Sequence, residues 1–311
     1  MRILVVGAGA IGGYFGGRLL AAKQDVTFLV RPRRAAELAG SGLQIQSPCG
    51  DVHIPQPPTV LAEDLKTTFD LILLSCKAYD LENAITSFAP AVGPETVILP
   101  LLNWMRHLNA LDERFGATRV LGGLCVISTV MEPGGGIAHL NKLHVLAFGE
   151  RDGSRSARVE AIAAAFSGGN FVTRLTETIL QEMWEKWVFI ATCAGVTCLM
   201  RSTIGDTVAA GAADLNAALL AECAAIATGQ GFQPGQAPME MSRSMLTAGN
   251  SPLAASMFRD IERGAPIEAD HMIGDMLQRG EKDGIASPLL RVVHAHLKTY
   301  EARRQRESAK H

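Results

Sequence analysis

The sequence predicts an α/β N-terminal domain followed by an all-α C-terminal domain. The chain begins with a short apolar segment that runs into a glycine-rich turn, and further apolar segments then alternate with helix-compatible ones to about residue 175. Only helix-compatible segments follow. Strands that alternate with helices form a parallel sheet, because each helix returns the chain to the same edge. We therefore expect domains at 1–175 and 176–311.

The first thirty residues have the order of a dinucleotide-binding unit. Ile3–Val6 is an apolar strand, a glycine-rich turn follows, and a helix-compatible run leads to a second strand at Asp25–Val30. Glycines at this spacing allow a tight turn, close approach of a pyrophosphate and close packing of the helix, whose N-terminal amides favour negative charge. We predict a Rossmann-type domain that binds the cofactor through Gly7, Gly9, Ala10, Ile11 and Gly12.

Arginine follows the second strand, where an NAD-binding chain normally presents an acidic residue to the ribose. The residues here are Arg31, Pro32, Arg33 and Arg34. A guanidinium carries a planar set of donors suited to a phosphate, so the sequence favours NADP over NAD. The alternative is a solvated basic loop with no specific ligand.

Two further strands end at polar residues. Phe69–Ser75 and Glu95–Leu102 are apolar, and Lys77 and Asn103 come just after them. Ligands gather at the carboxyl ends of parallel strands, so both residues are candidates for the site. From Val120 to Gly149, alternating residues around a Pro-Gly-Gly-Gly turn predict a hairpin that adds an antiparallel extension. A helix at Arg155–Phe166 and a last strand at Asn170–Leu175 complete this domain.

The C-terminal region reads as six helices separated by Gly, Pro or Asn-Ser. They are Glu177–Met200, Asp206–Gly229, Pro238–Ala248, Ala254–Arg263, Ile267–Asp283 and Pro288–Arg303. Lys186 stands at the start of a fourteen-residue uncharged stretch of the first helix. Burial there would lower the pKa of the lysine towards a range useful for proton donation. The alternative is a surface lysine paired with Glu182 one turn earlier.

Glu268 is a second candidate, just after Pro266. An acid in the first turn of a helix also complements the helix dipole, so simple capping is the alternative interpretation.

Composition excludes several classes of protein. A net charge of −2 gives no reason to expect nucleic acid as a partner. No apolar stretch is long enough for a membrane span, and no separate leader precedes the glycine motif, so we expect a cytoplasmic protein. The six cysteines lack CxxC spacing, and no His/Cys cluster predicts a metal site. A homodimer is possible, although no heptad pattern indicates one.

Several separated motifs together resemble the ketopantoate reductases (2-dehydropantoate 2-reductases) over nearly the whole chain. Besides the glycine turn and the arginine after the second strand, they are Ser-Cys-Lys77-Ala, Leu-Leu-Asn103, Trp184-x-Lys186, and Ser256-Met-x-x-Asp260 with Glu268.

The resemblance implies the NADPH-dependent reduction of ketopantoate to pantoate, a step of pantothenate (vitamin B5) and coenzyme A biosynthesis. It places NADPH across the first domain and the 2-oxo acid between the domains. Lys186 would be the general acid, and Glu268 would hold the substrate hydroxyl and the lysine in register. Ser256 would bind the substrate carboxylate, while Lys77 and Asn103 would lie between the nicotinamide ribose and the substrate. Lys77, Asn103 and Glu268 would thus also touch the cofactor.

The chain departs from that family pattern at four positions. Members usually carry asparagines four and eight residues after the lysine and a third near the end of the next turn, where this chain has Ile190, Ala194 and Ile204. Members also carry glycine after the asparagine at 103, where this chain has Trp104. A buried hydroxyl left without a partner costs about 1–3 kcal/mol. A more apolar pocket for another branched 2-oxo acid is therefore a second hypothesis, and a non-catalytic NADP-binding sensor is a third. Lys186 together with Glu268 favours an enzyme.

Overall fold

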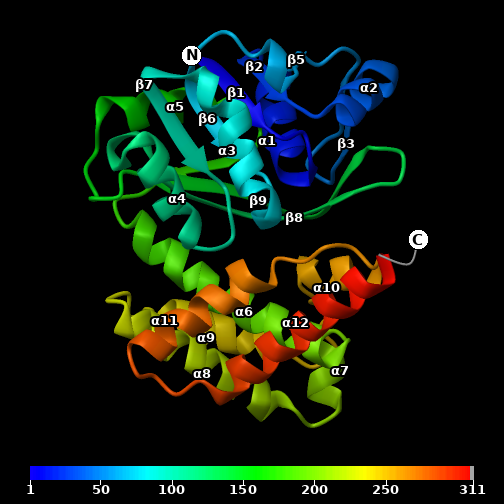
Figure 1. Cartoon of the computed structure of the whole chain (residues 1–311), viewed down its shortest axis with the longest axis vertical. Coiled ribbons are helices and arrows are strands. Elements are labelled where there is room, and N and C mark those ends of the chain that lie inside the picture. The colour runs from blue at the N-terminus through cyan, green and yellow to red at the C-terminus, as the bar shows by residue number, and fades with distance from the viewer. Residues whose placement is uncertain (309–311) are drawn as a thin grey trace. The chain divides into compact units, whose positions relative to one another are not determined.

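The computed structural model describes residues 1–308, which divide by their contacts into two compact units. The first comprises residues 1–102 and 107–180, and the second comprises residues 103–106 and the helices from residue 181 onward. Figure 1 shows the strands of the first unit in blue to green and the helices of the second in green to red.

The first unit contains a five-stranded sheet in which every neighbouring pair is parallel. Its strands, in spatial order, are β5 (Thr59–Val60), β2 (Asp25–Leu29), β1 (Arg2–Val6), β6 (Phe69–Leu74) and β7 (Val92–Pro100). This is the order of a dinucleotide-binding sheet, whose first strand is central. Ile3, Leu4 and Val5 of β1 have no exposed surface, because the sheet is covered on both faces. The predicted α/β class is confirmed.

A second sheet contains the predicted hairpin. β8 (Gly122–Met131) and β9 (Ile137–Gly149) pair antiparallel, and β9 also pairs parallel with β10 (Val172–Leu175) and β3 (Leu43–Gln46), next to which lies β4 (Val52–Ile54). These five strands form a second sheet, and an isolated bridge between Ile98 on β7 and Val120, just before β8, links it to the first sheet. Strands β3, β4 and β5 are two to four residues long, too short to show a periodicity in the sequence.

The helices of the first unit connect and cover these strands. They are α1 (Ala10–Ala21), α2 (Pro32–Ser41), α3 (Leu81–Phe88), α4 (Arg106–Phe115) and α5 (Ala157–Phe166), with 3₁₀ turns at Ala62–Asp64, Ala78–Asp80, Ala89–Ala91 and Ala117–Arg119. Glycines let α1 lie close to its neighbours. A Cβ on Gly16 would come within 2.6 Å of Phe28 on β2, and one on Gly17 within 2.7 Å of Ile45 on β3.

The second unit is helical, and no strand occurs between residues 176 and 308. Its helices are α6 (Ile179–Met200), α7 (Ile204–Ala209), α8 (Ala213–Gly229), α9 (Gln236–Leu246), α10 (Ser256–Glu262), a π-helix (Asp270–Gly274), α11 (Asp275–Lys282) and α12 (Pro288–Ser308). The helix predicted over 206–229 is two helices, because Gly211 adopts a φ of 82° and ends the first. The helix predicted from residue 267 starts later, as a π-helix.

None of the helices within residues 1–308 has both the length and the apolar character required to cross a bilayer.

Glu150 joins the end of β9 to the start of α5. Its carboxylate accepts hydrogen bonds from Ser156 Oγ at 2.5 Å and from Arg158 Nε and Nη2 at 2.6 and 2.5 Å. Ser156 in turn caps α5. The Arg158 hydrogen bonds lower the pKa of Glu150, against the opposing effect of burial. The carboxylate thus stabilises the fold in its ionised form.

We expect Glu150→Gln to lower the free energy of unfolding at pH 7 by about 1.5–3 kcal/mol, the usual contribution of hydrogen bonds to a charged group. Because the folded-state pKa is lowered, this stabilisation is present above the unfolded-state pKa of about 4.3 and is lost as the pH falls through the folded-state pKa. Urea unfolding across that range measures the change. Glu160→Gln removes an exposed ion pair between α5 and Arg155, which precedes this helix, so it is the matched control and should change little. If the free energy of unfolding of Glu150→Gln were lower by the same amount at every pH, this account would be contradicted.

Candidate functional site

A cavity of about 540 Å³ opens at the carboxyl ends of β1, β2 and β6 in the first unit. The glycine turn after β1, the arginines after β2 and the residues after β6 contribute to its wall. Among the sequence-predicted residues, Gly7, Gly9, Arg31 and Lys77 line it. Ala10, Ile11 and Gly12 form the first turn of α1 immediately after the lining residues. The structure therefore brings the predicted cofactor residues of the first unit together.

The glycines of the turn have three different reasons to be glycine. Gly7 has a φ of 92°, in the left-handed region that side chains disfavour. A Cβ on Gly12 would lie 2.2 Å from both the Gly7 carbonyl oxygen and Ser75 Oγ, so α1 could not approach the sheet as it does. A Cβ on Gly9 would meet nothing within 4 Å. Gly9 therefore leaves open space at the N-terminus of α1, where no side-chain cap occurs among the described residues.

The three arginines after β2 have different surroundings. Arg34 is largely buried and donates from Nε to the Ala8 carbonyl oxygen at 3.0 Å and from Nη1 to the Gly135 carbonyl oxygen at 2.9 Å. Its Nη2 is buried and has no hydrogen-bond partner within the described chain. Arg31 is 68% exposed and pairs with Asp80 at 2.6 Å, which raises the pKa of the arginine. Arg33 is almost fully exposed.

These features fit a dinucleotide. The first amides of α1 have no acceptor within the helix, and the open space at Gly9 lets a pyrophosphate reach them. The arginines add positive charge in the same cavity. The residues present can therefore hold the phosphates of such a cofactor.

In the second unit, Lys186 and Asn103 are in direct contact. Lys186 Nζ donates to Asn103 Oδ1 at 2.9 Å, although 83 positions separate them. Lys186 lies on α6, where Trp187, Val188 and Ala191 are buried behind it. The lysine itself is only half-buried. The amide oxygen thus fixes the ammonium group at the edge of an apolar helix.

The segment that carries Glu268 is tied to the same part of α6. Trp187 Nε1 donates to the Met272 carbonyl oxygen at 3.0 Å, and the ring of Trp104 meets that of His271 edge-on at a centroid distance of 5.8 Å. Glu268 itself is 4% exposed and lies just before the π-helix. π-helical turns occur often at functional sites. Residues 103–104, 186–187 and 268–272 therefore converge within the second unit.

Ser256 is the exposed first residue of α10. The start of this helix is attached to α6, because the Ala255 amide donates to Thr197 Oγ1 at 3.3 Å. Among the positions that depart from the family pattern, Ala194 and Ile204 are fully buried, Trp104 is buried and Ile190 is half-buried.

Two groups of polar residues could not be recognised from the sequence. Asp275 is buried directly after the π-helix, and burial raises its pKa although Arg279 lies 3.2 Å away. Cys49, His139 and His144 form a cluster in the first unit. The nearest sequence signal for the cluster is the pair of histidines five residues apart, which carries no metal signature by itself.

Comparisons with known proteins identify the family. Residues 3–153 match the family model described as ketopantoate reductase PanE/ApbA, and residues 178–301 match its C-terminal counterpart. An uncharacterized oxidoreductase of Bacillus subtilis (strain 168), YkpB, is 37% identical over 97% of this chain and 99% of its own length.

Solved structures agree with this assignment. The 2-dehydropantoate 2-reductase of Geobacter metallireducens superposes with a TM-score of 0.88 at 28% identity, over 96% of this chain and 99% of the other. A D-mandelate dehydrogenase, solved with NADH and anilino(oxo)acetate, has a TM-score of 0.88 at 20% identity over 98% and 99%, which shows a shared fold. The chain is an oxidoreductase that belongs to the ketopantoate reductase family.

Proposed function

We propose that this protein reduces the 2-keto group of ketopantoate to pantoate with NADPH, a step of pantothenate and coenzyme A biosynthesis. The observation that carries the proposal is the Lys186–Asn103 hydrogen bond, which holds an ammonium group at the edge of an apolar helix. The similarity to the 2-dehydropantoate 2-reductase of Geobacter metallireducens supports the choice of substrate.

The proposed chemistry assigns each unit a task. The first unit holds the cofactor phosphates, and bound NADPH supplies the hydride to C2 of the substrate. Lys186 donates a proton to the carbonyl oxygen, so the ketone gains a hydride and a proton and becomes an alcohol. The positive charge of Lys186 also stabilises the negative charge that develops on this oxygen. Asn103 keeps the ammonium group in place, and Glu268 and Ser256 would orient the hydroxyl and carboxylate of the substrate.

A different branched 2-oxo acid is the second candidate substrate. Positions 190, 194 and 204 carry apolar residues in this chain, where ketopantoate reductases usually carry asparagines. The side chains of Ala194 and Ile204 are apolar and have no exposed surface, so neither can form a hydrogen bond with a substrate hydroxyl. A substrate without the ketopantoate hydroxyl would lose nothing from these changes. A non-catalytic sensor is less consistent with the chain, because binding a dinucleotide would not require the Lys186–Asn103 pair.

We expect NADPH oxidation with ketopantoate, or with one other branched 2-oxo acid, in a panel measured by steady-state kinetics. Lys186→Ala should lower kcat by about 10²–10⁴-fold, because it removes the proton donor. Lys282→Ala, at an exposed lysine of α11, is the matched control and should keep full activity. If another 2-oxo acid is turned over and ketopantoate is not, that acid is the substrate and the ketopantoate assignment is wrong. Full turnover by Lys186→Ala would refute the mechanism.

Arg31→Ala tests the proposed preference for NADPH. Loss of a charge-assisted contact to the 2′-phosphate should weaken NADPH binding about 10–100-fold, while NADH, which lacks this phosphate, should change little. Fluorescence titration of both cofactors measures the two affinities. Arg155→Ala, at another exposed arginine of the first unit, should leave both unchanged. An equal loss of affinity for NADPH and NADH would show that Arg31 does not bind the 2′-phosphate.

Gly9→Ala and Gly12→Ala separate cofactor binding from folding. The added methyl at Gly9 enters open space, so stability should be retained while dinucleotide affinity falls by at least about 10-fold. The added methyl at Gly12 meets the Gly7 carbonyl oxygen at 2.2 Å and should cost about 1–3 kcal/mol of stability or more. Thermal unfolding and cofactor titration of both variants distinguish the two effects. Unchanged affinity in Gly9→Ala would contradict the proposed position of the pyrophosphate.

A further inference from the structure

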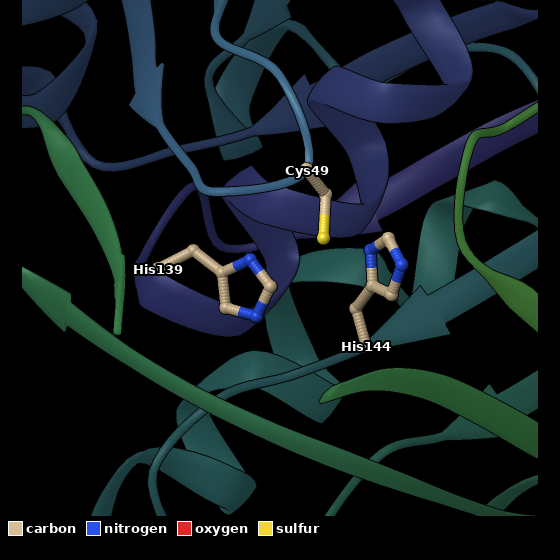
Figure 2. A group of neighbouring side chains, drawn as sticks. All are labelled: Cys49, His139 and His144. Atoms are coloured by element: carbon tan, nitrogen blue, oxygen red, sulfur yellow. The ribbon is translucent and has the colours of Figure 1, made fainter. Parts of the chain in front are cut away.

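Cys49, His139 and His144 form a compact group of metal-ligating side chains in the first unit. One donor atom from each residue lies within 4.8 Å of the donors of the other two. Figure 2 shows the Cys49 sulfur between the two imidazoles, with both rings turned towards it. None of the three residues lines the cavity of the candidate cofactor site. The proposed reductase chemistry therefore leaves this group unexplained.

A bulge in β9 brings the two histidines together. Residues five apart on a regular strand point to opposite faces. Here His139 pairs with Thr129 and His144 with Ile127, so five steps along β9 match only two along β8. The extra residues 140–142 are exposed, and the two imidazole rings stack at a centroid distance of 5.5 Å. Bulges of this kind serve to redirect side chains.

Hydrogen bonds prepare His139 as a ligand. Its Nε2 lies 3.0 Å from the Leu143 carbonyl oxygen, which can only accept, so Nε2 carries the proton in the neutral ring. The lone pair of the ring is therefore on Nδ1, which lies 2.9 Å from Ser47 Oγ and 3.3 Å from Tyr14 Oη. Metal-bound histidines commonly donate their second N–H to a backbone carbonyl in this way.

His144 and Cys49 are also held in position. His144 Nδ1 lies 2.8 Å from Tyr14 Oη, which orients this ring. The loop that carries Cys49 is fixed from two sides. Asn170 Nδ2 donates to the Cys49 carbonyl oxygen at 3.0 Å, and Arg18 Nη2 donates to that of Gly50 at 2.7 Å.

We propose that Cys49, His139 and His144 bind a borderline transition-metal dication such as Zn²⁺. Imidazole and thiolate are the ligands such ions prefer, and three protein ligands leave a fourth position for water or the Tyr14 hydroxyl. Bonds of about 2.0–2.3 Å in a tetrahedron place the donors about 3.3–3.6 Å apart, so small side-chain rotations close the group around the ion. On binding, the Cys49 thiol releases its proton to solvent.

Metal binding at this site would join three elements of the first unit. The ligands come from the β3–β4 loop and both sides of the β9 bulge, and Tyr14 belongs to α1, whose first turn lies beside the cofactor cavity. An ion that binds only the folded state raises the free energy of unfolding by RT ln(1 + L/Kd), where L is the concentration of free ion. The site is therefore structural, and it is independent of the proposed reaction.

The test titrates the full-length, metal-free protein with Zn²⁺ in a calorimeter and, separately, with Co²⁺ in an absorption spectrometer. We expect one ion per chain, a thiolate-to-cobalt charge-transfer band, and a rise in Tm with Zn²⁺. Cys49→Ser should abolish the band, and both Cys49→Ser and His144→Ala should weaken Zn²⁺ binding by at least about 10-fold. Tyr14→Phe should keep the band, because it retains all three ligands.

His53→Ala is the matched control, since His53 is an exposed histidine on β4 and lies outside the cluster. It should bind Zn²⁺ as the unaltered protein does. The proposal fails if the unaltered protein binds no stoichiometric Zn²⁺, if the cobalt complex lacks the charge-transfer band, or if Cys49→Ser and His144→Ala bind as tightly as His53→Ala. Circular dichroism of each variant confirms that lost binding does not reflect lost folding.

Discussion

The close approach of α1 to its two sheets is the constraint on which the first unit depends. Gly12 lets the first turn of the helix touch the β1 turn, and Gly16 and Gly17 bring its middle against Phe28 and Ile45. A side chain at any of these positions would push the helix away, because the neighbouring atoms lie within 2.2 to 2.7 Å of a Cβ. The same approach directs the free amides of the helix to the end of β1, so packing and the proposed phosphate binding have one cause.

Helix α6 has a comparable role in the second unit. Trp187 ties it to the π-helical segment, Thr197 ties it to the start of α10, and Lys186 reaches Asn103. Trp187 and Thr197 are themselves buried, as are Val188 and Ala191 beside them, so packing in the core sets the orientation of this helix. The proposed proton donor therefore stands on a rigid element, which favours accurate positioning of a reacting group.

The sequence predicted what depends on local pattern. The strands at 2–6, 25–29 and 69–74 and the long helix at 179–200 have strong apolar patterns, and the structure confirms them. The hairpin and the last strand of the second sheet were predicted, but β3 and β4 were not, because they are short and are defined only by their pairing with β9 and with each other. Gly211 falls inside a predicted helix, but its positive φ and the hydrogen bonds from the Gly211 and Ala212 amides to the Val208 and Thr207 carbonyl oxygens end α7 in a local C-terminal cap.

The candidate residues divide in the same way. Glycine spacing indicated the turn, the end of a strand indicated Asn103, and the start of an uncharged helical stretch indicated Lys186. No local pattern predicts the contact of the last two residues across 83 positions. The cluster of Cys49 with two histidines lay beyond sequence reasoning for a physical reason. A strand of regular pleat would separate His139 from His144, and only the β9 bulge unites them.

The Arg31–Asp80 pair limits how strongly the proposed site can discriminate between the two cofactors. Arg31 is 68% exposed, so its pairing with Asp80 is weak and a phosphate, which carries more charge than a carboxylate, can displace it. Asp80 nevertheless remains beside the arginine and repels the incoming phosphate. The same carboxylate could accept hydrogen bonds from the unmodified ribose hydroxyls of NADH. The preference for NADPH therefore depends on the attraction between Arg31 and the 2′-phosphate, reduced by the repulsion between Asp80 and that phosphate. Removing Asp80 should increase the preference.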